Sequence, residues 1–328
     1  MKQLALPPLN AAWDPCLQTP DTDEFCWTPL QLAARAGDID KIRRVLAQDP
    51  AAANEPPRGY YGQTALQAAC VQGDAAAVQL LVDAGADVHF SGGNNFQRNA
   101  LQIACGYGDE RVVDILLAAG ARVNEVTPAA ANGGGGQSSR PPVAVTRYNG
   151  RTALQAACDR GHVALVRRLL RLGADVNAPP SPTAGVTAIQ AAARGGYLAI
   201  VELLLRAGAD ANAPAAKYKG FTALQGACLG GHAEVAALLL GQEEVDVHAL
   251  GGLYGDGMAL HAAAAAGRVD IIEMLLAAGA DVNACSRKRG RAQSALQSAV
   301  AGGHDEAART LRERGATGKS GGGRLLFS

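Results

Sequence analysis

The segment TALQAACDRGHVALVRRLLRLGADVN, residues 152–177, decides the fold. Thr152 is a suitable N-cap, and the ALQAAC that follows consists largely of small, helix-favouring residues. Gly161 predicts a tight turn, after which apolar residues spaced three and four apart predict a second helix with one buried stripe. Gly173 favours a left-handed end to that second helix. The segment therefore predicts two short helices joined by a turn.

Related segments recur along most of the chain. Their starts are separated by 36, 35, 53, 35, 35, 36 and 36 residues, so eight units cover residues 28–316. The single spacing of 53 indicates an insertion between the third and fourth units. The units begin at Thr28, Thr64, Asn99, Thr152, Thr187, Thr222, Met258 and Ser294.

The phrases T-x-L-x-x-A, V-x-x-L-L and G-A-D-V-N in these units resemble the ankyrin repeat, and the ALQAA style resembles fungal ankyrin arrays. The resemblance implies an all-α ankyrin-repeat solenoid of eight helix–turn–helix units with β-hairpin fingers. Three departures stand out. The units are 35 or 36 residues long, the family's TPLH is TALQ with His kept only at His261, and EEVD replaces the GAD turn in repeat six. We expect Gln to form the hydrogen bonds of the missing His, whereas the turn of repeat six stays open.

The composition divides the chain into three domains. Residues 1–27 form an N-terminal leader or cap, for which folding over the first repeat and an extended conformation are both open. Residues 28–316 form the repeat array, and residues 317–328 a flexible C-terminal tail. Residues 127–145, within the insertion, are rich in Gly, Pro and Ala, which predicts a disordered loop above continuous helix packing.

Charge and hydropathy exclude several classes of protein. The 30 basic residues balance the 30 acidic residues, so we expect no direct binding to nucleic acid. No run of 18 apolar residues predicts a membrane span, and the prolines of MKQLALPPLN argue against a secretory signal. Seven cysteines without such a signal favour a reducing, intracellular location, either cytoplasmic or nuclear.

The sequence offers no convincing catalytic, cofactor or metal site. Four cysteines share the phrase AxxxAC, but equivalent positions in stacked repeats lie about 10 Å apart, too far to bind one metal ion. GATGKS lacks the earlier glycine of a phosphate-binding loop because Glu313 stands there. We therefore expect no enzyme activity and no cofactor. The four cysteines are Cys70, Cys105, Cys158 and Cys228.

Half of the aromatic residues fall in the predicted fingers. Tyrosines recur four residues before a repeat start, as at Tyr148 and Tyr218. The family resemblance implies that fingers and first helices line a concave binding face, where Tyr suits an interface. The regular position equally fits packing on a neighbouring finger, and both roles can hold. The candidate partner-binding residues are Tyr60, Tyr61, Phe96, Tyr107, Tyr148, Asp159, Arg160, Arg194, Tyr218, Phe221 and Tyr254.

The segment RKRGR is the strongest charge cluster. Arg287, Lys288, Arg289 and Arg291 lie in the last predicted finger, and nine basic against three acidic residues follow from residue 285 onward. The cluster fits a nuclear import signal, a contact with an acidic partner, or a solvated finger tip.

These features predict a monomeric, non-enzymatic scaffold or adaptor that binds another protein through its concave face and fingers. A first alternative is a transcriptional co-regulator that acts in the nucleus through a protein partner. A second is the detached sensor-type repeat region of a larger signalling protein, which the ALQAA units also resemble. A partner's identity is not written in the repeats, because specificity lies in their variable surface residues.

Overall fold

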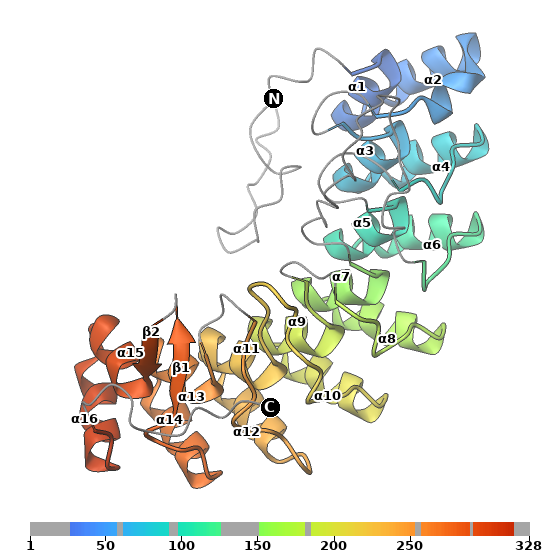
Figure 1. Cartoon of the computed structure of the whole chain (residues 1–328). Coiled ribbons are helices and arrows are strands. Elements are labelled where there is room, and N and C mark those ends of the chain that lie inside the picture. Colours follow the sequence, from blue (N-terminus) through green and yellow to red (C-terminus); the bar gives the residue numbers. More distant parts are fainter. Residues whose placement is uncertain are drawn as a thin grey trace, which may run out of the picture. The chain divides into compact units, whose positions relative to one another are not determined.

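The computed structural model describes residues 27–57, 62–91, 98–125, 151–180, 185–252, 257–288 and 291–317. The leader up to residue 26, the insertion and the tail beyond residue 317 lie outside these residues. The chain forms two compact units, Met1–Gly133 and Gly134–Ser328, which are described separately (Figure 1). No helix in the described segments is long and apolar enough to cross a membrane.

Unit one contains three pairs of helices. Figure 1 shows the first helices of the pairs in one row and the second helices in a row beside it. Within these rows α1 packs on α3 and α3 on α5, while α2 packs on α4 and α4 on α6. The elements are α1 (Pro29–Ala36), α2 (Ile39–Gln48), the 3-10 helix η3 (Pro50–Asn54), α3 (Ala65–Gln72), α4 (Ala75–Asp83), α5 (Ala100–Tyr107) and α6 (Glu110–Ala118).

Unit two contains five further pairs with the same two-row arrangement (Figure 1). The last finger forms a two-stranded antiparallel hairpin, β1 (Cys285–Lys288) and β2 (Arg291–Ser294), in which Lys288 pairs with Arg291. Together the described residues confirm the predicted eight helical pairs. The helices are α7 (Ala153–Arg160), α8 (Val163–Arg171), α9 (Ala188–Gly195), α10 (Leu198–Arg206), α11 (Ala223–Gly230), α12 (Ala233–Leu240), α13 (Ala259–Ala265), α14 (Val269–Ala277), α15 (Ala295–Ala301) and α16 (Asp305–Glu313).

A capping box starts seven of the eight first helices. In repeat four the Thr152 hydroxyl accepts the backbone N–H of Gln155, whose side-chain oxygen accepts the N–H of Thr152 at 3.0 Å. Repeat seven is the exception, because Met258 provides no side-chain cap. The first helix of repeat four ends at Gly161, whose φ of 77° is left-handed and favours glycine.

Small side chains fill the core between the two rows. In repeat four Ala157 and Cys158 of α7 and Leu165 and Leu169 of α8 are all buried. Alanine lets neighbouring first helices approach closely, and the leucines of the second helices fill the space between the two rows. The scarcity of aromatic residues is thus a property of thin, closely stacked helices.

Trp27 is buried at the start of the array, and the Arg35 guanidinium lies 5.0 Å from the centre of its ring. It is the last residue of the predicted leader. The cation above the ring adds an electrostatic attraction to the apolar burial. This end of the leader therefore packs on the first repeat.

The turn of repeat six keeps the left-handed residue of the other turns despite its different sequence. Glu244 has φ of 64°, which is the left-handed conformation held elsewhere by glycines such as Gly208 with φ of 85°. Left-handed backbone is costly for a residue with a Cβ atom. The sequence did not decide whether this turn forms. The structure shows that it forms, with local strain at Glu244.

Candidate binding surface

In repeats one to six the third residue of the first helix, a Gln, ties that helix to its own finger. Gln225 Nε2 donates to the carbonyl oxygens of Ala249 at 2.8 Å and Gly257 at 2.7 Å. In repeat seven His261 Nε2 lies 3.0 Å from the carbonyl oxygen of Gln293. The Gln residues thus hold the fingers in the way that His261 does, as the sequence predicts. The fingers are fixed in place because buried side chains form hydrogen bonds with their backbone carbonyl oxygens.

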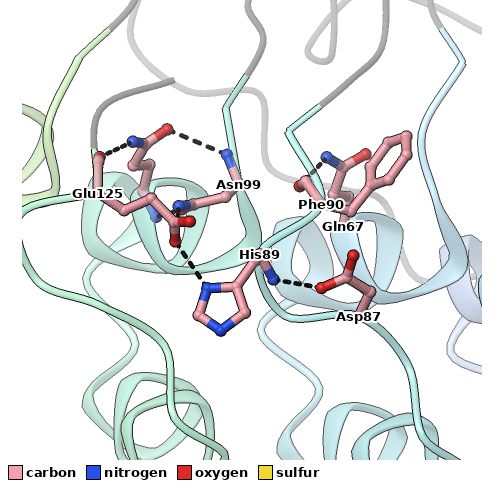
Figure 2. A network of polar contacts seen from close by, with 7 residues as sticks. Gln67, Asp87, His89, Phe90, Asn99 and Glu125 are labelled. Atoms are coloured by element: carbon pink, nitrogen blue, oxygen red, sulfur yellow. Dashed lines mark hydrogen bonds and ion pairs between the residues drawn. The ribbon is translucent and has the colours of Figure 1, made fainter. Parts of the chain in front are cut away.

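Figure 2 shows further polar contacts that hold the fingers of unit one. Glu125, which follows Asn124 of repeat three, accepts a bond from Asn99 Nδ2 at 3.2 Å, and its Oε2 atom lies 2.9 Å from His89 Nδ1. Its carbonyl oxygen accepts a bond from Gln102 Nε2 at 2.9 Å. Glu125 therefore joins the fingers of repeats two and three at the edge where the predicted insertion begins.

Asparagines at the end of the G-A-D-V-N phrase join successive repeats. Asn177 Nδ2 donates to the carbonyl oxygen of Gly208 at 2.9 Å, and Asn177 Oδ1 accepts the N–H of Asp210 at 2.9 Å. Each such side chain therefore clamps the turn of the following repeat with two bonds. The same pair of bonds is made by Asn54, Asn212 and Asn283.

The two residues before the turn glycine, at the end of each first helix, vary between repeats, in contrast to the repeated buried positions. All of them are exposed or half-buried. They present cations, an acid, an amide, an aromatic ring or only small residues, depending on the repeat. From repeat one to repeat eight the pairs are Arg35–Ala36, Val71–Gln72, Gly106–Tyr107, Asp159–Arg160, Arg194–Gly195, Leu229–Gly230, Ala265–Ala266 and Ala301–Gly302.

Two of the predicted binding residues, Asp159 and Arg160, belong to an ion-pair cluster at the end of α7. Asp159 forms a salt bridge with the mostly buried Arg151, and Arg160 Nε lies 4.0 Å from Asp159 Oδ2. The charge of Asp159 is therefore largely balanced inside the chain. Arg160 is half-buried.

Arg194 and Phe221, also predicted to bind, lie against each other. The Arg194 guanidinium is 5.4 Å from the centre of the Phe221 ring. An added Cβ on Gly226 would lie 3.0 Å from that ring and 3.3 Å from Arg194 Cβ, so a glycine makes room for both. The end of α9 thus presents an exposed cation, Arg194, which is backed by the half-buried ring of Phe221 just before α11.

The other candidates divide by whether they lie in the described residues. Tyr218 is 37% exposed, and Lys217 Nζ is 5.4 Å from the centre of its ring. Tyr107 is half-buried at the end of α5. The backbone of the basic cluster is described at Arg287, Lys288 and Arg291, in β1 and β2. The candidates outside the described residues are Tyr60, Tyr61, Phe96, Tyr148, Tyr254 and Arg289.

The histidines that follow the turn glycine have a structural role. His232 Nε2 lies 3.1 Å from the carbonyl oxygen of Arg194, and His304 Nε2 lies 3.0 Å from that of Ala265. Each ring therefore donates to the first helix of the preceding repeat. His232 also covers Gly196, where an added Cβ would lie 2.4 Å from the ring.

The cysteines of the AxxxAC phrase are core residues. Cys70, Cys105, Cys158 and Cys228 are buried, and burial raises the pKa of the Cys228 thiol to about 12. Burial likewise raises the pKa values of Cys70 and Cys158, which keeps these thiols protonated. Over the described ranges, no group of three His, Cys, Asp or Glu residues is placed to hold a metal ion.

Comparison with known families agrees with this architecture. A model described as ankyrin repeats (3 copies) matches residues 10–91, 30–127, 90–180, 130–215, 181–251 and 209–286, which together span most of the chain. The chain belongs to the ankyrin-repeat family. Ankyrin repeats are generally protein–protein interaction modules, and ankyrin-repeat proteins are typically non-enzymatic scaffolds. No curated protein matches the chain.

Several features of this ankyrin surface were not singled out from the sequence. Arg151 precedes a repeat start like any finger residue, and only the fold shows that it is buried beside Asp159. Lys217 and Lys219 flank Tyr218, and Leu250 is 53% exposed in the next finger. The K-Y-K pattern was a visible signal, whereas the exposure of Leu250 in the finger joined to it is visible only in the structure.

Proposed function

We propose that the protein is a non-enzymatic adaptor that binds a protein partner through the ends of its first helices and its fingers. The observation that carries the proposal is the contrast between repeated buried positions and varied exposed ones. A surface that varies from repeat to repeat on one fixed framework suits the recognition of one particular partner.

The fixed framework also supports a pre-formed surface. Side chains such as Gln225 and Asn177 bond the fingers and turns to the helices, so little ordering is left for the moment of binding. The exposed Arg194 and the half-buried Arg160 provide cations on two repeats of unit two. Arginine supported by an aromatic ring, as Arg194 is by Phe221, is typical of residues that dominate binding energy.

Affinity capture followed by mass spectrometry tests this proposal. The full chain is compared with Arg160→Glu/Arg194→Glu, and with a matched control, Arg167→Glu/Arg171→Glu, on the exposed side of α8. We expect the wild type and the control to recover the same protein, and the first-helix variant to bind it about tenfold more weakly.

The recovered protein is then purified and titrated against the chain by calorimetry. Equal affinity for both variants would contradict binding at the first-helix ends. Failure of the wild type to recover any protein would contradict the adaptor function itself. Circular dichroism of each variant shows that the helices are intact before binding is compared.

We propose the nuclear co-regulator as a second candidate, supported by the position of the basic cluster. Arg287 and Lys288 in β1 and Arg291 in β2 lie on either side of the closed end of the last finger, away from Ser294, which caps α15. A fluorescent fusion of the full chain is compared with its Arg287→Ala/Lys288→Ala variant. We expect nuclear fluorescence that the variant loses, and a wild-type fusion that stays in the cytoplasm would exclude import by this cluster.

A further inference from the structure

Two neighbouring fingers of unit two are joined through their backbones. The N–H of Gly252 in the finger of repeat six donates to the carbonyl oxygen of Gly220 in the finger of repeat five at 2.9 Å. Residues 216–220 and 250–252 are called the finger platform here. Gln225 holds the base of the second finger through Ala249, so the platform is also tied to α11.

The finger platform is rigid because its backbones touch. An added Cβ on Gly220 would lie 2.2 Å from the backbone nitrogen of Ala216, and one on Gly252 would lie 2.4 Å from the Ala216 carbonyl oxygen. Only glycine permits these approaches. Lys219 between them has φ of 57°, a left-handed conformation that is costly for lysine. Strain of this kind is found where a side chain is held in a useful position.

The platform presents two cations, an aromatic ring and an aliphatic side chain. Lys217, Tyr218 and Lys219 are consecutive and all exposed. Leu250 is two residues from Gly252, as Tyr218 is from Gly220, and it is 53% exposed. An exposed leucine and an exposed tyrosine on two joined, rigid fingers provide an interaction surface of mixed apolar and polar character.

Charge identifies the kind of partner that fits. The sequence has no Asp or Glu between Asp210 and Glu234, so finger five carries lysines without acids of its own. Arg194, which stacks on Phe221 next to Gly220, adds a third exposed cation. In finger six the nearest acids along the chain are Asp246, in the turn, and Asp256, outside the described residues.

We propose that the finger platform binds an acidic peptide segment of a protein partner that also carries an apolar side chain. The carboxylates would contact Lys217 and Lys219, and the apolar side chain would pack on Tyr218 and Leu250. This inference rests on the proposed function and names the surface and chemistry of its partner. Nucleic acid fits less well, because stacking sites use several rings and this chain has no net positive charge.

A displayed library of random twelve-residue peptides tests the proposal on the full chain. We expect the selected peptides to be rich in Asp and Glu and to carry Leu, Ile or Phe. A labelled peptide from this selection should bind Lys217→Glu/Lys219→Glu about tenfold more weakly, because two exposed attractions become repulsions. The matched double reversal Arg167→Glu/Arg171→Glu should bind like the wild type.

A second variant separates binding from folding. Lys219→Gly removes one charge and relaxes the left-handed backbone, so it should unfold at a higher denaturant concentration while binding the peptide more weakly. A variant that merely damaged the fold would lose both properties. Tyr218→Ala should weaken binding without changing its dependence on salt, whereas the lysine variants should reduce that dependence.

Three results would overturn the proposal. They are selected peptides without acidic enrichment, equal binding by the lysine variant, and tighter binding of a labelled single-stranded thymidine oligonucleotide that the same variant abolishes. The adaptor function is tested apart from this. If Lys217→Glu/Lys219→Glu still binds the captured partner, the proposed role of the finger platform is wrong and the adaptor function is not affected. If neither the wild type nor any variant captures a partner, the adaptor function is wrong as well.

Discussion

Replacement of Glu244 by glycine should stabilise the protein. Glu244 holds the left-handed position of the repeat-six turn with φ of 64°, and its carbonyl oxygen accepts the bond from Asn212 Nδ2 at 2.8 Å. Gly208 holds the equivalent position in repeat five. The glycine at this position in repeat five shows that the turn needs the left-handed backbone and makes no use of a side chain.

The magnitude follows from two opposing effects. A residue with a Cβ atom pays about 1–2 kcal/mol for left-handed backbone. Glycine costs about 0.5–1 kcal/mol in conformational entropy on folding. Glu244 is exposed, so its side chain contributes little packing that the substitution would remove. We therefore expect Glu244→Gly to raise the free energy of unfolding by about 0.5–1 kcal/mol.

Urea unfolding of the full chain, followed by circular dichroism, measures this change. Glu243→Gly is the matched control, because Glu243 is also exposed and adjacent but is not left-handed. The control suffers only the entropic cost and should lower the free energy of unfolding by about 0.5–1 kcal/mol. The two variants should thus change the free energy of unfolding in opposite directions. If Glu244→Gly lowers the midpoint as the control does, the strain assigned to this turn is wrong.

Three further changes test the framework. Gln190→Ala removes the bond to Ala213 and half of a capping box from a buried site, and should cost about 3 kcal/mol in urea unfolding. A loss below 1 kcal/mol would contradict that role. Asn212→Ala should cost about 1 kcal/mol and speed amide exchange at Asp246, whose N–H it binds. Burial lowers the folded-state pKa of His261, so the free energy of unfolding should fall as the pH drops below about 6.5. His261→Gln should make this fall smaller. If the free energy of unfolding of the variant and of the wild type falls in parallel with pH, the reasoning is refuted.

Repetition made the helices predictable. A motif such as Thr152 to Asn177 carries its cap, its turn glycine and its apolar spacing in one segment, and eight copies reinforce the interpretation. These are local properties of the chain, so no knowledge of distant contacts is needed. The role of Gln in place of His also followed from chemistry, since an amide can donate to the same finger carbonyls as Gln225 does.

The binding surface was less predictable because exposure depends on neighbouring repeats. Asp159 looks free in the sequence, yet a buried Arg151, which comes before the start of the same helix, balances its charge. Leu250 looks like a core residue, yet finger five lies against the backbone of the following glycines, Gly251 and Gly252, and the leucine side chain is exposed. Sequence spacing places residues on a finger, but it does not say which residues the next finger covers.

A histidine replaces the clamp asparagine in repeat two, at His89, and in repeat six, at His248, and the second replacement has a consequence for how the array opens. His248 stands at the clamp position of repeat six, and in the described residues no side-chain bond joins it to Gly279 or Asp281 of repeat seven. In a stacked array each repeat contacts only its neighbours, so the stability is approximately the sum of the stabilities of the repeats and of the couplings between neighbouring repeats. The coupling between repeats six and seven is therefore weakened. Thermal fraying from the C-terminal side should release repeats seven and eight together and halt at repeat six, so local melting would leave the finger platform folded.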